Sequence, residues 1–307
     1  MTIDLLKLVC DARSLRDRTK RAYATGVRQW LEFAGDDPSG WTPIQAQAFY
    51  DHMLTRLSPK TLNNVTLVGL QFVFDRAAAL YGTPNPIGAI DPVKLPADRD
   101  VVRRALTAPQ VKALVAACAG PRLIDRRDRA IVILGLYTGM RAMSLAAVET
   151  WEPGDDETYW FCRVPLKGGA LYSVPVDARV RHALTPYTND VPSGRLFRQI
   201  RARVTPAGDT EVPVGGLSED GVYRALRTRG ADAGLTFHPH LLRHTFVTWC
   251  RSGGVDELLV AAVTGHKPRS TVRMLDTYTD QRQLAREAAR QCYEAITRRL
   301  TGDGTHL

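Results

Sequence analysis

The sequence predicts a mainly α-helical protein of two domains, with one small antiparallel β-hairpin. At about 150 residues per domain, a chain of 307 residues is long enough for two. Apolar residues recur at helical spacing over most of the chain. The segment "TPNPIGAIDPVKLPADRDVVRRAL" joins four prolines to a run of charges, which is typical of a linker. We therefore expect a helical domain over residues 1–92, a linker over 93–104 and a second domain over 105–307.

Three helices separated by turns are expected before the linker. The first has apolar residues at helical spacing over residues 23–31 and ends at Gly35. The second begins near Pro43, because proline suits the first turn of a helix. The third is capped by Ser58 and ends at Gly82.

The second domain is expected to be helical around one hairpin. Two β-rich runs flank Lys167-Gly168-Gly169, which indicates a hairpin whose tip carries Lys167. We expect residues 201–216, rich in glycine and proline, to be a loop. The final helix repeats an apolar residue at every fourth position, and this stripe requires a partner surface. The helices expected here cover residues 107–120, 125–148, 218–230, 241–253, 255–265 and 281–300.

Composition narrows the class of protein. No run of about 18 apolar residues is present, so we expect no membrane span, and the first residues do not resemble a signal peptide. Five scattered cysteines without a CxxC pair fit reduced thiols in the cytoplasm. The formal net charge of +9 favours a polyanionic partner such as nucleic acid.

Three histidines and an arginine fall within the seven residues 238–244, and three interpretations are open. His240 and His244, four positions apart, share a helix face as zinc ligands do, but the HExxH glutamate position is Leu241 and we expect no metal. Each histidine alone is compatible with ordinary packing. Alternatively, His240 and Arg243 bind an anion, because a guanidinium can donate to two phosphate oxygens.

Other residues along the chain favour the anion site. Arg141 follows a glycine at the expected start of a helix, where exposed amides attract anions. Lys167 is an ammonium able to donate a proton. His266 follows another glycine, and Tyr278 comes after it. Together these residues form a metal-free set for phosphoryl transfer, with the tyrosine as nucleophile and the cations neutralising the phosphate.

Four ordered segments carry a resemblance to a known family. "TGMRAMSL", "KGGALYSVPV", "HPHLLRHTF" and "VTGHKPRSTVRMLDTYT" resemble the arginine, lysine, HxxR and GH…Y boxes of the tyrosine recombinases, which include phage integrases, Xer recombinases and Cre. Residues 1–92 resemble the family's helical core-binding domain. The resemblance implies a two-domain fold in which a mixed α/β catalytic domain follows the helical domain.

The resemblance also implies a role for each residue of the site. Tyr278 attacks the scissile phosphate, forms a 3′-phosphotyrosyl bond and releases a 5′-hydroxyl. Arg141 and Arg243 hold the non-bridging oxygens, and Lys167 protonates the leaving oxygen. His240 assists as an acid or base, and His266 hydrogen-bonds the phosphate. No metal or other cofactor is implied.

Two positions depart from the family pattern. Ser144 stands three positions after Arg141, where the family usually has an acidic residue. Tyr278 lies twelve positions after His266, against about nine or ten in the family. Tyr293 is the alternative nucleophile, although its place in an amphipathic helix is typical of packing.

Residues outside the chemistry are expected to contact DNA. We expect the two domains to clamp duplex DNA. The residues expected to enter a groove from the third helix are Lys60, Thr61, Asn63 and Asn64. Arg224 and Arg227 are expected to contact phosphates, together with Arg229. A solvated helix face is the alternative in both places.

The expected function is site-specific DNA recombination for integration, excision or resolution. Its partners are a specific double-stranded site, a homo-tetramer on synapsed DNA with a monomer or dimer in solution, and accessory proteins in some systems. We expect a cytoplasmic, nucleoid-associated enzyme without a lambda-like arm-binding domain. The helix at 281–300 resembles the segment that family members dock into a neighbouring protomer; packing on its own domain is the alternative. The alternative functions are a type IB topoisomerase-like nicking and rejoining enzyme, or a catalytically silent DNA-binding relative.

Overall fold

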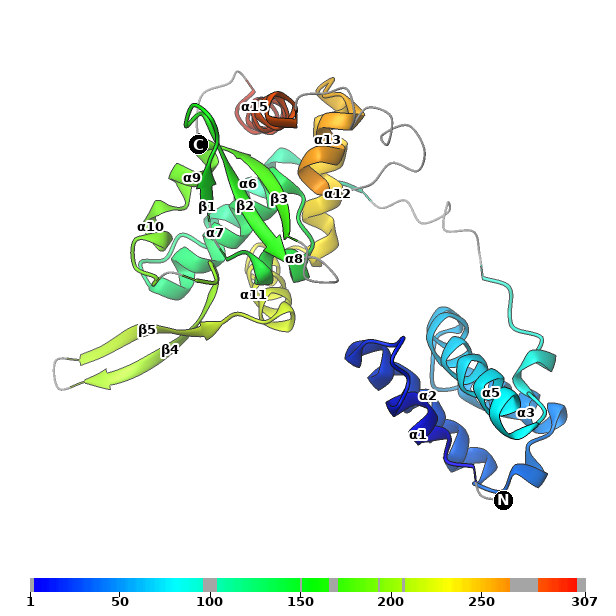
Figure 1. The fold of residues 1–307 in the computed structure, drawn as a ribbon. Coiled ribbons are helices and arrows are strands. Elements are labelled where there is room, and N and C mark those ends of the chain that lie inside the picture. Colours follow the sequence, from blue (N-terminus) through cyan, green and yellow to red (C-terminus); the bar gives the residue numbers. More distant parts are fainter. Residues whose placement is uncertain are drawn as a thin grey trace. The chain divides into compact units, whose positions relative to one another are not determined.

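The computed structural model describes residues 3–95, 104–149, 151–165, 171–192, 194–205, 208–265 and 281–302. The chain divides into two compact units, Met1–Val102 and Arg103–Leu307 (Figure 1). This division falls within the linker predicted at residues 93–104. The fold is mostly helical, as predicted.

The first unit is a helical bundle around an aromatic core. The ring of Trp30 packs edge-on against Phe49 and Phe74, with centroids 5.3 and 5.5 Å away. All three predicted helices are present, and the first ends at Gly35 as expected. The helical elements are α1 (Leu5–Cys10), α2 (Asp17–Ala34), η1 (Pro38–Gly40), α3 (Pro43–Leu54), α4 (Pro59–Thr61), η2 (Leu62–Leu67), α5 (Val68–Tyr81) and η3 (Ile87–Ala89).

The third predicted helix contains a change of geometry. Ser58 caps its start by accepting a hydrogen bond from the Thr61 amide, and Gly82 ends it in the left-handed conformation. Between these ends, η2 is a π-helix. The wider turn of a π-helix is rare and shifts the side chains that follow around the helix axis, so the exposed face of this helix cannot be read from a 3.6-residue period.

The second unit surrounds one large apolar core. Helix α7 lies at its centre with nearly every residue buried, and α12 and α15 pack on it. Its helices are α6 (Ala108–Ala116), α7 (Leu123–Thr138), α8 (Ala142–Ala147), α9 (Ala178–Ala183), α10 (Thr185–Thr188), α11 (Glu219–Asp232), α12 (Pro239–Ser252), α13 (Glu257–Thr264) and α15 (Gln281–Thr301). The short helices α9 and α10 were not predicted.

The predicted hairpin is part of a three-stranded antiparallel sheet. Strands β2 (Tyr159–Pro165) and β3 (Leu171–Asp177) pair from Tyr159↔Asp177 to Pro165↔Leu171, and β1 (Trp151–Pro153) adds to the free edge of β2. The alternation of buried Cys162 and Val164 on β2 explains why this segment is extended. The predicted hairpin tip with Lys167 lies outside the described residues.

The prediction of a loop at residues 201–216 is wrong. Strands β4 (Arg198–Thr205) and β5 (Gly208–Gly216) form a two-stranded antiparallel ribbon that projects from the second unit (Figure 1). The ribbon has a register shift between Arg198 and Ile200. Glycine and proline usually indicate a loop, yet cross-strand hydrogen bonds on an exposed ribbon tolerate them.

Candidate active site

Arg243 is the buried centre of the candidate site. It lies in the second turn of α12, only 8% exposed. Its Nη1 donates to the carbonyl of Gly139 at 2.8 Å and to the carbonyl of Thr264 at 3.2 Å. These carbonyls belong to the C-terminal ends of α7 and α13, where the helix dipoles are negative and stabilise a cation. The fold therefore fixes the guanidinium between two helix ends.

Arg141 brings a second positive charge to the same place. Gly139 ends α7 in the left-handed conformation, and Arg141 stands at the N-cap position of α8 without a side-chain cap bond. The Arg141 side chain is exposed and makes no hydrogen bond or ion pair within the part of the chain that the structure describes. Burial, together with repulsion from Arg141, lowers the pKa of Arg243 to about 10, so the Arg243 guanidinium is still charged at neutral pH. Ser144 is half-buried and makes no bond to Arg141 in that part of the chain.

The histidines begin the same helix. His238 is the N-cap of α12, and His240 is exposed in its first turn, with ring centroids 6.4 Å apart. His240 precedes Arg243 by about one turn and so shares its end of α12. His244 is half-buried. Among the described residues there is no cluster of three or more histidine, cysteine, aspartate or glutamate side chains suited to hold a metal ion.

Tyr172 adds to the site a residue that sequence reasoning did not identify. It lies on β3, and its hydroxyl donates to the carbonyl of Ala262 in α13. Burial raises the pKa of Tyr172 to about 12, so the hydroxyl stays a neutral donor. In sequence, only its position five residues after Lys167 on the predicted hairpin marked it as near the site.

Three predicted catalytic residues, Lys167, His266 and Tyr278, lie outside the described residues. Among the described elements, β2, β3 and α13 lie close to them in sequence. Strand β2 ends at Pro165 and β3 begins at Leu171, while α13 ends at Gly265 with φ +67°.

Tyr293, the alternative nucleophile, is a packing residue in this structure. It lies on α15 and is 7% exposed. Its ring stacks on Tyr137 with centroids 5.3 Å apart, and the guanidinium of Arg179 on α9 sits 3.9 Å from the centroid of the Tyr293 ring. A buried tyrosine whose ring packs against both of these groups is poorly placed to attack DNA.

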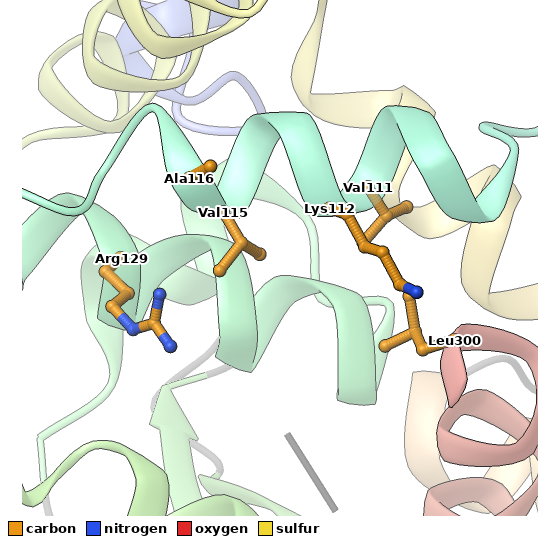
Figure 2. A pocket seen from close by; sticks show the side chains of 6 residues that line it. All are labelled: Val111, Lys112, Val115, Ala116, Arg129 and Leu300. Carbon is orange, nitrogen blue, oxygen red and sulfur yellow. The ribbon is translucent and has the colours of Figure 1, made fainter.

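Helix α15 packs on its own unit. Its apolar stripe of Ala288, Cys292, Ile296 and Leu300 is almost fully buried. The last of these, Leu300, lines an open apolar cavity of about 220 Å³ beside Val111 of α6 (Figure 2). Lys112 and Arg129 also line the cavity, but none of the predicted catalytic residues does. The cavity therefore belongs to helix packing and not to the candidate site.

Residues predicted to contact DNA from the first unit are exposed on one helix. Lys60, Thr61 and Asn64 face solvent near the π-helical segment. Asn63 is instead held in place: it accepts from the Tyr50 hydroxyl at 2.8 Å and donates to the Val93 carbonyl at 3.0 Å. The Val93 amide closes this triangle by donating to Tyr50 at 2.9 Å. The triangle fixes the start of the predicted linker beside this helix.

Residues predicted to contact phosphates from α11 separate into two groups. Arg224 and Arg227 are exposed. Arg229 is not: its guanidinium donates to Asp125 at 2.6 Å, to Asp128 at 2.9 Å and to the Ala117 carbonyl at 3.2 Å. The prediction that Arg229 contacts phosphate is therefore wrong, because its side chain instead holds α11 on α7.

Known proteins are similar to this chain in sequence. Residues 104–284 match the model of the phage integrase family. The tyrosine recombinase XerC of Roseiflexus sp. (strain RS-1) is 26% identical over 286 residues, which cover 88% of this chain and 86% of that protein. XerD of Xanthomonas axonopodis pv. citri is 27% identical over 268 residues, covering 81% and 82%.

Solved structures show the same fold. A lambda integrase (75–356) dimer bound to a COC′ core site has a TM-score of 0.64 at 17% identity, covering 92% of this chain and 96% of that one. The XerH recombinase bound to its difH substrate has a TM-score of 0.62 at 18% identity, covering 91% and 82%. No helix among the described residues is long and apolar enough to cross a membrane.

Proposed function

The chain belongs to the phage integrase family and is a tyrosine recombinase, and we propose that it cuts and rejoins duplex DNA at a specific site through Tyr278. The observation that carries this proposal is the pair of guanidiniums at Arg141 and Arg243. Two positive groups that repel each other are stabilised together by an anion between them. A DNA phosphodiester, with two non-bridging oxygens, fits such a pair.

In the proposed reaction the phosphate passes directly from one covalent bond to another. The Tyr278 oxygen attacks phosphorus, the bond to the 5′ oxygen breaks, and a 3′-phosphotyrosyl bond forms. Lys167 donates the proton that makes the leaving group a 5′-hydroxyl, while His240 assists as acid or base. His266 and the two arginines hold the phosphate oxygens as charge develops. Attack by a second 5′-hydroxyl reverses these steps and joins a new strand.

DNA binding is proposed to involve both units. We propose that Lys60, Thr61 and Asn64 of the first unit meet a groove. We propose that Arg224 and Arg227 of the second unit meet phosphates; the exposure of all five side chains supports this. Lambda integrase is known as a dimer on a core site and as a tetramer on a Holliday junction. We propose the same assembly for this chain, acting on DNA in the cytoplasm.

Covalent trapping tests the proposal. The protein is incubated, without metal, with a pool of nicked duplexes whose central sequence is random, and adducts are isolated on a denaturing gel. The DNA is sequenced and the modified peptide is mapped by mass spectrometry. Tyr278→Phe is expected to abolish the adduct and to leave DNA binding intact, whereas Tyr293→Phe keeps the adduct.

Each other outcome has a definite meaning. An adduct on Tyr293 contradicts the assignment of the nucleophile. DNA binding without any adduct supports a catalytically silent relative, the alternative that the twelve-residue spacing between His266 and Tyr278 favours.

A further inference from the structure

Tyr172 and Arg243 hold the same helix end through two different carbonyls. Helix α13 has only eight residues, and its last carbonyls have no partner within the helix. The amide of Gly265 donates to the carbonyl of Ala261 at 2.9 Å. The carbonyl of Ala262 accepts from Tyr172, and the carbonyl of Thr264 accepts from Arg243. The end of α13 is thus fixed by one side chain from β3 and one from α12.

Close packing makes this helix end sensitive to small movements. A β-carbon added at Gly265 would lie 3.0 Å from Cε1 of Tyr172, so the ring rests directly on the glycine backbone. The end of α7 is packed as closely: a β-carbon added at Gly139 would lie 2.7 Å from the ring of Phe246 and 3.3 Å from Cγ2 of Thr264. A shift of α13 therefore moves the Thr264 carbonyl relative to Arg243.

We infer that Tyr172 is a positioning residue, which sets the direction of the Arg243 guanidinium by fixing the C-terminal end of α13. This inference rests on the proposed function of Arg243 as a phosphate ligand. Tyr172 itself does not touch the phosphate in this role. Its hydroxyl holds Ala262, α13 holds the Thr264 carbonyl, and that carbonyl holds Nη1 of Arg243.

The test compares two substrates that differ at one oxygen. On an ordinary phosphodiester, Tyr172→Phe is expected to slow single-turnover formation of the adduct about tenfold, the value of one hydrogen bond of about 1.4 kcal/mol. In a methylphosphonate at the scissile position, an uncharged methyl group replaces one non-bridging oxygen. The reacting group then needs less positive charge from the protein. There the variant and the wild type are expected to differ less than about threefold.

A matched control separates positioning from general stability. Tyr187 is buried, and its hydroxyl bonds the Leu196 carbonyl at 3.1 Å and the Arg198 amide at 3.0 Å. Tyr187→Phe also removes a buried tyrosine hydroxyl, but the two bonds of this hydroxyl involve neither α13 nor Arg243. It is expected to lower the melting temperature slightly and to give the same rate relative to wild type on both substrates.

The outcomes distinguish the inference from the proposed function. A defect of Tyr172→Phe that is equal on both substrates shows a structural role only and overturns the inference. Full activity of Tyr172→Phe on the phosphodiester overturns it as well. If the wild type forms no adduct with the phosphodiester, the proposed function fails, and the inference fails with it.

Discussion

Replacing Arg229 by alanine is expected to destabilise the second unit strongly. The Arg229 side chain is 12% exposed and bonds Asp125 and Asp128, which are themselves 3% and 4% exposed. Removing one member of a buried ion pair costs about 3–5 kcal/mol, because the remaining charge is buried without its partner. Asp125 keeps Arg122, and Asp128 keeps Arg127, so we expect the lower end, about 3 kcal/mol.

Urea denaturation measures this loss. With a slope of about 2–3 kcal/mol/M for a unit of this size, the midpoint is expected to fall by about 1–1.5 M. Arg227→Ala is the matched control, since Arg227 lies on the same helix but is exposed. It is expected to change stability by less than about 0.5 kcal/mol.

The opposite result would refute the reasoning. If Arg229 bound DNA and did not stabilise the fold, the free energy of unfolding of Arg229→Ala would lie within about 1 kcal/mol of the wild-type value. Its DNA affinity would then show a salt slope smaller by about 0.9, the value of one lost phosphate contact. Arg227→Ala is expected to give that change of slope instead.

Three further predictions follow from the site and its surroundings. Arg141→Ala is expected to slow adduct formation at least about a hundredfold, because a preorganised charge is lost. DNA binding, measured by gel shift, is expected to stay nearly unchanged. An unaffected rate would show that Arg141 does not act in the site. Gly265→Ala is expected to lower stability by about 1–2 kcal/mol in urea, because φ is +67° and Tyr172 is close, whereas Gly88→Ala, with open space around it, stays near wild type. Hydrogen bonding from Arg122 lowers the pKa of Asp125 from 3.8 to about 2. The stabilisation of the folded state present above pH 4 is therefore lost as the pH falls towards 2, by roughly 2 kcal/mol. Asp125→Asn is expected to flatten this part of the curve of unfolding free energy against pH, and an unchanged curve would contradict this prediction.

The local patterns in the sequence determined most of the elements. Ser58, Gly35 and Gly82 act through bonds and dihedral angles of their immediate neighbours, so the helices they bound could be predicted and are confirmed. The β-rich runs at β2 and β3 were also readable, because both flank the turn residues Lys167-Gly168-Gly169. The four ordered segments that resemble the family boxes indicated the chemistry of the site, because each keeps its characteristic residues within a few positions of one another.

Tertiary structure decided what depends on partners far along the chain. Residues 201–216 form a ribbon because each strand supplies the hydrogen bonds of the other, and composition cannot show this pairing. Arg229 and Arg227 are two positions apart in the same helix and alike in sequence, yet only the first meets Asp125, more than a hundred residues away.

The candidate site divides in the same way. The sequence by itself indicated residues of the candidate site, among them Arg141, His240 and Arg243. Only the tertiary structure showed that Arg243 is buried between the ends of α7 and α13, and that Tyr172 from β3 holds one of those ends. A residue's charge belongs to its side chain, whereas its direction and its pKa are set by neighbours that folding brings to it.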